Sequence, residues 1–398
     1  MERLRYVVGG PCGLHEPEFD ERAWRYVKET IDTGWVSSAG EFVSRFERAL
    51  AEYTGARHVI AVVNGTAALH AGLLVAGVQT GDEVLLPSLT FVASANAIAH
   101  AGAVPHFLDI EPYTLGIDPV RLERYLGRIG RTVEGKLLNR KTGRRIAGLM
   151  CVHVFGTPCK IDDLNRICVQ FGIPMFEDAT EALGSRLNGR HPGTLGRFGA
   201  LSFNGNKIIT TGGGGAILTG DNEFAAAARA ITTTAKRPHR WAFVHDRVAY
   251  NYRMPNLNAA LGCAQLESLP KILEDKRQLA NRYSEAFRDL CGARLMTAVP
   301  GCDSNCWLNN LMLNPEFAAL RDEILDATND LGIQTRPVWL LLHRLDMYGQ
   351  APRDDLLVAC DFERRIISLP SSARLGRAGI RRGICKRCEP NTASENLA

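Results

Sequence analysis

Two polar side chains that could carry out chemistry stand at the ends of short apolar segments. Lys207 follows the segment 198–203, within Ser202-Phe-Asn-Gly-Asn-Lys207, and Asp178 ends Pro174-Met-Phe-Glu-Asp178. A buried lysine is costly unless it is paired or used chemically. The spacing lets neighbouring strands bring the amine and the carboxylate to one end of a sheet. An amine that can form an imine and a fixed carboxylate are what pyridoxal 5'-phosphate requires. On these two residues alone, a loop lysine and a strand-end aspartate are an equally good interpretation.

The segment Asn64-Gly65-Thr66 supplies a third part, a site for a phosphate group. It follows the apolar segment 58–63 and opens a helical pattern at 67–76. Free backbone N–H groups, a hydroxyl and the positive end of the helix dipole would meet there. Taken alone, Asn64 would be an ordinary helix N-cap. With the lysine and the carboxylate in this order along the chain, the phosphate of the same cofactor is favoured.

With these three features the sequence resembles the DegT/DnrJ/EryC/StrS sugar aminotransferases, a family of fold-type I pyridoxal-phosphate enzymes. The resemblance runs from about Gly9 to about Leu375. The segments that carry it are Thr33-Gly-Trp-Val-Ser37, Asn64-Gly-Thr-Ala-Ala-Leu69, Gly81-Asp-Glu-Val84, Pro87-Ser-Leu-Thr-Phe91, Glu177-Asp-Ala179, Ser202-Phe-Asn-Gly-Asn-Lys207 and Tyr250-Asn-Tyr-Arg-Met254.

The resemblance implies a cofactor site and a dimer. Lys207 and Asp178 would be catalytic, and no metal ligand is implied. Phe91 would stack on the cofactor ring, although a buried core phenylalanine is the alternative. Asn251 would reach the cofactor phosphate of the other subunit of a homodimer with shared active sites, although a turn asparagine is the alternative. The implied cofactor-binding residues are Gly65, Thr66, Phe91, Asp178, Glu181, Ser202, Lys207 and Asn251.

The resemblance also suggests a substrate. The run from Asn204 through Gly215, with Arg336-Pro-Val-Trp339, is most similar to the branch that serves bacillosamine and legionaminic acid synthesis. That branch moves an amino group from L-glutamate to C4 of a UDP-linked 4-keto-6-deoxy-N-acetylhexosamine. The alternative is a GDP-4-keto-6-deoxymannose aminotransferase of the perosamine synthase type. The implied substrate-binding residues are Trp35, Ser37 and His343, and a packed tryptophan in a helix stop is the alternative for Trp35.

The composition indicates an ordinary globular enzyme. Of 398 residues, 45% are apolar and 23% are charged, and no apolar run approaches the length of a membrane span. Because the first residues lack the features of a signal peptide, we expect a cytoplasmic protein with reduced cysteines. The net charge of +4 comes from six basic residues between Arg374 and Arg387. We expect a solvated tail there rather than a nucleic-acid site, and only a weak zinc hypothesis attaches to Cys385-Lys-Arg-Cys388.

The periodicity predicts an α/β protein with a large, mostly parallel sheet covered by helices, and a smaller α/β domain after it. We expect the large domain at 1–255, the small one at 256–375 and a basic, disordered tail at 376–398. A helix at 17–32 would bury Trp24, Val27 and Ile31, and a surface hairpin would lie within 125–147. His153 would line the pocket or be a satisfied core histidine. The other expected elements are strands 58–63, 83–87, 104–109, 146–155, 174–178, 198–203, 215–219 and 307–313 and helices 41–54, 66–76, 91–101, 161–171, 222–231, 258–288 and 316–331.

Three other functions are compatible with parts of this pattern. A sugar dehydratase on the same fold would carry histidine in place of Lys207, so this alternative is disfavoured. A non-catalytic binding or regulatory protein on the scaffold should have lost Lys207 or Asp178, and both are present. A nicotinamide dehydrogenase would need a glycine-rich fingerprint after the first strand, where the chain has Asn64-Gly-Thr instead.

Overall fold

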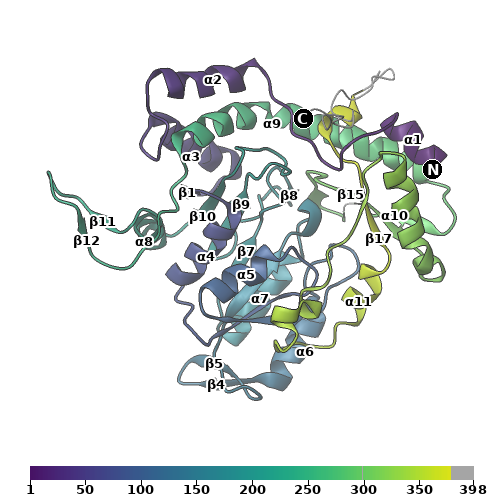
Figure 1. Cartoon of the computed structure of the whole chain (residues 1–398). Coiled ribbons are helices and arrows are strands. Elements are labelled where there is room, and N and C mark those ends of the chain that lie inside the picture. Colours follow the sequence, from purple (N-terminus) through teal and green to yellow (C-terminus); the bar gives the residue numbers. More distant parts are fainter. Residues whose placement is uncertain (298, 378–398) are drawn as a thin grey trace, which may run out of the picture.

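The computed structural model of the chain describes residues 1–297 and 299–377 and is built around one large sheet (Figure 1). It has seven strands, of which β10 alone runs antiparallel to its neighbours β1 and β9. Across the sheet the strands are β1 (His58–Val62), β10 (Gly215–Thr219), β9 (Phe198–Ser202), β7 (Met175–Asp178), β6 (Ile146–Val152), β2 (Glu83–Pro87) and β3 (Val104–Leu108). The α/β fold with a mostly parallel sheet is therefore as predicted.

Helices cover both faces of this sheet, as buried parallel strands require. Neighbouring residues of a strand point to opposite faces, so Ile60 packs in the cluster formed with α4, α5 and α8, whereas Val59 packs in the one formed with α3 and α9. The helices of the first face are α4 (Gly65–Val75), α5 (Ala93–His100) and α8 (Asn222–Thr232). Those of the second are α3 (Glu41–Thr54), α6 (Pro119–Ile129), α7 (Ile161–Phe171) and the first half of α9 (Asn256–Phe287).

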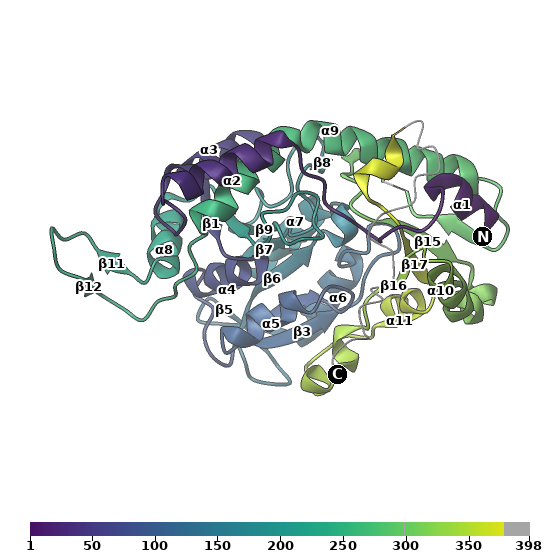
Figure 2. The same cartoon turned by 45° about the horizontal axis from the view of Figure 1, so that its top comes forward.

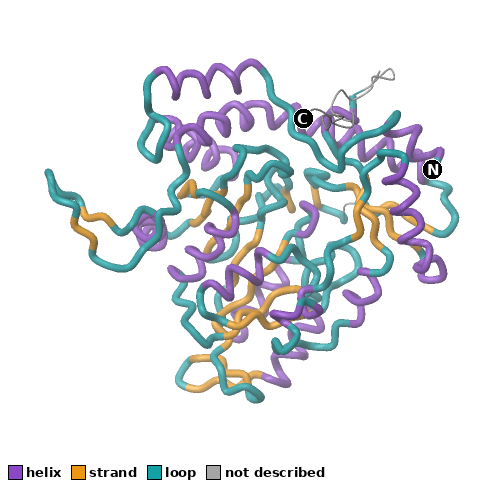
Figure 3. The backbone as a smooth tube through the Cα atoms, in the orientation of Figure 1, coloured by secondary structure: helices purple, strands orange, loops and turns teal. Residues whose placement is uncertain are grey.

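A smaller, antiparallel sheet of four strands lies beside the end of α9 (Figure 3). Its core is shared with α1, whose Leu4 and Val7 pack with Tyr283 of α9 and Leu369 of the sheet. In order the strands are β13 (Ala293–Leu295), β15 (Asn309–Leu313), β17 (Ile366–Leu369) and β16 (Arg336–Pro337). The helices around it are α1 (Glu2–Val8), α10 (Arg321–Asp330), α11 (Leu357–Glu363), η2 (Pro315–Leu320) and η5 (Ala373–Gly376). By contrast, η3 (Leu342–Arg344) and η4 (Asp346–Tyr348) pack against the large sheet.

The helix α9 joins the two parts of the molecule. Figure 2 shows it running from α2 and α3 at one end to α1 at the other. The chain thus changes from the large sheet to the small one within a single helix, and a domain division at residue 256 stays a prediction. The predicted tail and the cysteine pair at 385 and 388 lie outside the described residues, apart from 376 and 377. Within the described ranges, no helix is both long enough and apolar enough to cross a membrane.

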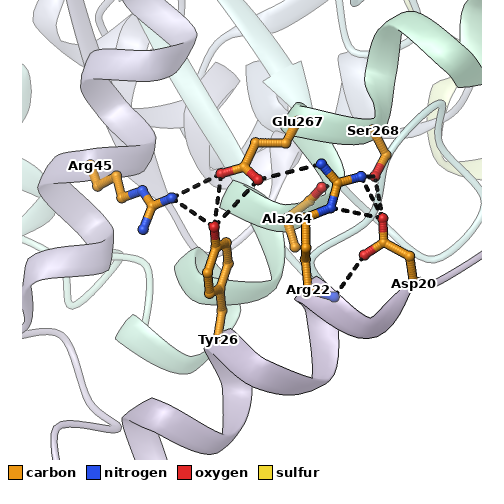
Figure 4. A network of polar contacts seen from close by, with 7 residues as sticks. All are labelled: Asp20, Arg22, Tyr26, Arg45, Ala264, Glu267 and Ser268. Atoms are coloured by element: carbon orange, nitrogen blue, oxygen red, sulfur yellow. Dashed lines mark hydrogen bonds and ion pairs between the residues drawn. The ribbon is translucent and has the colours of Figure 1, made fainter.

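The prediction for the helix at 17–32 is wrong about its buried face. Helix α2 (Glu21–Asp32) begins later, after its N-cap Asp20, and leaves Trp24 71% and Ile31 59% exposed. It buries Ala23, Tyr26 and Thr30 instead. Figure 4 shows the reason, which is a polar network against α9. The Glu267 carboxylate accepts hydrogen bonds from Tyr26 Oη at 3.1 Å and from Arg45 Nη2 at 2.8 Å, and Arg22 and Ser268 extend the network to Asp20.

Three short pairs of strands stand apart from both sheets. The hairpin expected within 125–147 is present, but its turn lies at Glu134 and Gly135 rather than at Gly143, and α6 occupies its predicted start. A second hairpin carries exposed Trp241 and Phe243. The remaining elements are β4 (Gly130–Val133), β5 (Lys136–Asn139), β8 (Arg186–Leu187), β14 (Cys302–Asp303), β11 (Lys236–Arg237), β12 (Val244–His245) and η1 (Val154–Gly156).

A buried histidine in the large part should make stability depend on pH. Burial lowers the pKa of His191 to about 4 from 6.5. The unfolded chain therefore binds the proton more tightly, so stability is lost as the pH falls from about 6.5 towards 4. His191→Gln keeps an acceptor for the N–H of Gly184, which donates to His191 Nε2 at 3.1 Å. Between pH 7 and pH 5 we expect urea-unfolding free energy to fall by about 2 kcal/mol more in the unsubstituted protein than in His191→Gln. Equal losses in the two proteins would contradict this assignment.

Candidate active site

Lys207 lies in a nearly buried position just beyond the end of β9. Its backbone N–H donates to the carbonyl of Asn204 at 3.0 Å, which closes a turn after the strand. The side chain is 11% exposed, and Nζ donates to Glu181 Oε1 at 3.3 Å. The same nitrogen lies 4.3 Å from the centre of the Trp307 ring. The amine is thus held between one carboxylate and one aromatic face, where it is poorly hydrated and can react.

Asp178 ends β7, next to β9 in the sheet, so the two predicted catalytic residues do stand at the ends of neighbouring strands. Its side chain is buried. Oδ2 accepts a hydrogen bond from Ser94 Oγ at 2.6 Å, and Oδ1 accepts one from the Thr180 backbone N–H at 3.1 Å. These two hydrogen bonds fix the direction of the buried carboxylate. Ser94, in α5, was not identified from the sequence.

Glu181 links the lysine to the neighbouring loop. Its Oε2 accepts a hydrogen bond from the Phe155 backbone N–H at 2.9 Å, while Oε1 receives the lysine amine. Burial raises the pKa of Glu181, the Lys207 charge partly offsets this, and the nearby Asp178 charge adds to the rise. Glu181 can therefore exchange a proton with Lys207 more readily than an ordinary carboxylate.

The start of α4 forms the expected cradle for a phosphate. Asn64 caps the helix by accepting a hydrogen bond from the Ala67 N–H at 2.7 Å, and Thr66 stands in the first turn. A Cβ atom on Gly65 would lie 2.9 Å from Ser202 Cβ and 3.1 Å from Thr180 Cγ2, so Ser202 is adjacent to the helix start. Glycine leaves open the space that an anion needs near the helix N–H groups. The Lys207 amine, the Asp178 carboxylate and the start of α4 thus follow the carboxyl ends of β9, β7 and β1. Together they offer the groups that pyridoxal phosphate requires.

Aromatic rings form a wall beside the lysine. Phe91 is 50% exposed, so a buried core phenylalanine is excluded. Its ring centre lies 6.3 Å from that of Trp339, which stacks on Phe155 at 5.0 Å. The Phe155 ring in turn lies 6.4 Å from Trp307. Phe155 and Trp307 were not identified from the sequence, because the residues that flank them form no motif typical of a functional site.

A cavity of about 730 Å³ opens along this wall. Among its lining residues are Asn206, Trp307, Arg336 and Trp339, together with His15. The indole N–H of Trp307 donates to the Asn206 carbonyl at 2.7 Å, which ties this cavity to the loop of Lys207. A volume of this size can admit a sugar ring next to the amine.

The other predicted residues lie on separate segments. Nδ1 of His343 is hydrogen-bonded to Ser88 Oγ at 2.8 Å, just past the end of β2. Trp35 is 60% exposed, so the alternative of a packed tryptophan is wrong. The carbonyls of Trp35 and Ser37 accept hydrogen bonds from Asn256 at the start of α9. Asn251 is exposed and pairs with Thr233. The single chain does not bring Trp35, Ser37 and Asn251 into contact with Lys207.

The glycine of the cradle offers a direct test of the phosphate site. Gly65→Ala would press a methyl group against Ser202 and Thr180. Because overpacking costs about 1–3 kcal/mol, we expect the Kd for pyridoxal phosphate to rise about 10- to 100-fold. The measurement is a spectrophotometric titration of cofactor-free protein. Gly127→Ala in α6, where a Cβ meets nothing within 4 Å, is the matched control. Equal affinity of the two variants would remove Gly65 from the cofactor site.

This arrangement defines a pyridoxal phosphate-dependent aminotransferase of fold type I. The chain belongs to the DegT/DnrJ/EryC1/StrS aminotransferase family, whose sequence pattern matches residues 17–386. A GDP-perosamine synthase of Caulobacter vibrioides is 35% identical to it over 373 residues, which cover 92% of this chain and 95% of the relative. Another, from Vibrio cholerae, is 34% identical over 90% of this chain and 93% of the relative.

The solved structures agree with this membership. The aminotransferase TlmJ from Streptoalloteichus hindustanus has a TM-score of 0.82 and 28% identity, covering 91% of this chain and 94% of that one. Four predictions from the sequence are therefore confirmed. They are the family resemblance, the fold, the enzyme class and the pyridoxal phosphate cofactor. The non-catalytic alternative is set aside. The roles of the individual site residues stay predictions.

Proposed function

We propose that the protein transfers an amino group from L-glutamate to C4 of a UDP-linked 4-keto-6-deoxy-N-acetylhexosamine, in nucleotide-sugar and surface glycan synthesis. The observation that supports this most is the shared cavity of Asn206, Arg336 and Trp339 beside Lys207. These residues belong to the two segments that resemble the bacillosamine and legionaminic acid branch. Their meeting in one cavity is what a common role in binding the keto sugar requires.

Each of three side chains would have a separate role in the transfer of the amino group. Bound pyridoxal phosphate would supply the aldehyde carbon that takes up the amino group and the ring that accepts electrons. Lys207 Nζ would remove the proton from the α-carbon of L-glutamate and later deliver a proton to C4 of the sugar. Asp178, held by Ser94, would keep a negative charge next to the pyridine nitrogen. The ring of Trp307 would exclude water from the amine.

A second candidate substrate is GDP-4-keto-6-deoxymannose. It is favoured by the 35% identity to a GDP-perosamine synthase over almost the whole chain. The two substrates differ in the base of the nucleotide and in the 2-acetamido group of the sugar, so the pocket has to discriminate both features.

The experiment is a comparison of both keto sugar nucleotides with L-glutamate as donor. We expect kcat/KM to be at least about 100-fold higher for the UDP-linked substrate, since a buried polar group that is left unpaired costs several kcal/mol. Mass spectrometry would identify the amino sugar, and release of 2-oxoglutarate would report the donor. A preference for the GDP-linked sugar would establish the second candidate instead. Bleaching of a visible absorbance band by L-glutamate alone would test the donor separately.

We also propose that the protein works as a homodimer in the cytoplasm. Trp24 and Ile31 of α2 and Trp241 and Phe243 of the β11–β12 hairpin are exposed apolar side chains, which are costly to leave in water. Asn251, at the base of that hairpin, would then act in the site of the other subunit, and Trp35 and Ser37 would contribute to the substrate pocket. Sedimentation of the protein and of Trp24→Arg would test this, since a dimer is expected only for the former.

A further inference from the structure

A cluster of sulfur and nitrogen atoms lies at and beyond the end of β6, and none of its three residues lines the proposed substrate cavity. Cys151 is in β6, His153 follows that strand, and Cys159 lies in the loop before α7. All three side chains are buried. One sulfur or ring nitrogen of each lies within 4.8 Å of those of the other two. His153 has hydrogen-bond partners, as expected for a core histidine. That role does not account for the two cysteine thiols next to it.

The histidine is oriented by a carboxylate, as metal-binding histidines commonly are. Its Nε2 is hydrogen-bonded to Glu177 Oε2 at 3.1 Å. Glu177 itself is fixed by backbone N–H groups, which donate to both of its oxygens from Gly193, Leu195 and Gly196. Nε2 therefore carries the proton, and Nδ1 presents a lone pair. At present Nδ1 accepts the backbone N–H of Cys159 at 3.2 Å, a bond that a metal would replace.

Thiolate rather than thiol is the form of cysteine that ligates metals, so metal binding would release the protons of the two thiols. The site can also be approached, because Cys159 lines a surface cavity of about 430 Å³ together with Tyr113, Lys160 and Asp162.

We propose that Cys151, His153 and Cys159 bind a soft closed-shell metal ion, and that Cu⁺ is preferred over Zn²⁺. Two sulfurs and one imidazole nitrogen are soft donors. Structural Zn²⁺ takes a full tetrahedral set of ligands, whereas this group of potential ligands among the described residues has three members, all of them buried. The oxygens of Glu177 are already engaged. A trigonal site without a further ligand suits Cu⁺ better.

The test is a titration of the reduced full-length protein with Cu⁺ in competition with a chromophoric chelator, under anaerobic conditions. The background carries Cys385→Ser and Cys388→Ser, which removes the only C-x-x-C pair of the sequence. We expect about one equivalent of tightly bound Cu⁺, and at least about 100-fold weaker binding in Cys151→Ser and in Cys159→Ser. Cys263→Ser, a buried cysteine in a different cluster, should bind as the background does. The exposed Cys291 stays in every variant, so binding to it cancels in the comparison.

X-ray absorption of the Cu⁺ form of the background protein keeps the test independent of how well the variants fold. We expect two sulfur neighbours and one nitrogen neighbour. The proposal is overturned if binding survives Cys151→Ser unchanged, if Zn²⁺ binds more tightly than Cu⁺, or if the spectrum shows oxygen in place of sulfur. It is also overturned if Cu⁺ does not bind and peroxide instead joins Cys151 to Cys159.

Discussion

Lys207→Ala is expected to lower turnover of L-glutamate and the keto sugar at least about 10⁴-fold with saturating pyridoxal phosphate, because both the covalent attachment point and the base are lost. Nζ is the amine that donates to Glu181 at 3.3 Å and lies against Trp307. Since burial already raises the pKa of Glu181, that carboxyl can take up a proton when its partner is removed, and we expect the fold to survive. The measurement is kcat for amino-sugar formation, with circular dichroism to confirm folding.

Two further variants separate the roles of this amine. Lys207→Arg keeps a positive charge next to Glu181, but a guanidinium cannot be deprotonated in a protein and so cannot act as the base. It should be as inactive as the alanine variant and at least as stable. Lys160→Ala removes a half-exposed lysine that pairs with Glu111, and should keep full activity. Turnover of Lys207→Ala within about tenfold of the unsubstituted protein would rule out the mechanism.

The sequence alone predicts the large sheet and the functional residues that follow the carboxyl ends of its strands. Short apolar runs ending at Asp178 and just before Lys207 predict strands, and residues at the carboxyl ends of adjacent parallel strands must lie together. Ser94 and Trp307 could not be found in this way. Ser94 reaches Asp178 from the helix after another strand, and Trp307 comes from the chain 100 residues beyond Lys207. Neither of these two contacts produces a pattern of residue spacing that could be recognised in the sequence.

The face of α2 shows a different limit of the sequence. Residues 23, 26 and 30 and residues 24, 27 and 31 both follow helical spacing, and hydrophobicity alone favours the second set because it contains Trp24 and Ile31. The first set is buried because Tyr26 meets Glu267 and Arg45. Glu267 is more than 200 residues away in the chain, so a window of neighbouring residues cannot include it. Trp24 and Ile31 of the second set are exposed, and they become the best reason to expect a subunit interface.

Asp178→Asn is expected to lower kcat about 10²- to 10⁴-fold while the folded structure is kept. The amide has the shape of the carboxylate: its oxygen can still accept the Thr180 N–H, and the NH2 group that replaces Oδ2 can donate to Ser94 Oγ instead. What is lost is the charge that would keep the pyridine nitrogen of the cofactor protonated. The effect should therefore appear in kcat rather than in the KM for the sugar, for which we propose the cavity of Arg336 and Trp339.

Ser94→Ala distinguishes the charge of this carboxylate from its orientation. It removes the 2.6 Å hydrogen bond but keeps the carboxyl group of Asp178, so we expect a loss of only about tenfold. Asp162→Asn, at an exposed carboxylate that pairs with Arg190, is the control for a change of charge alone and should be fully active. If Asp178→Asn and Ser94→Ala were equally impaired, Asp178 would act through its position and not through its charge. If Asp178→Asn kept more than about a third of the activity, a residue other than Asp178 would have to hold the cofactor ring protonated.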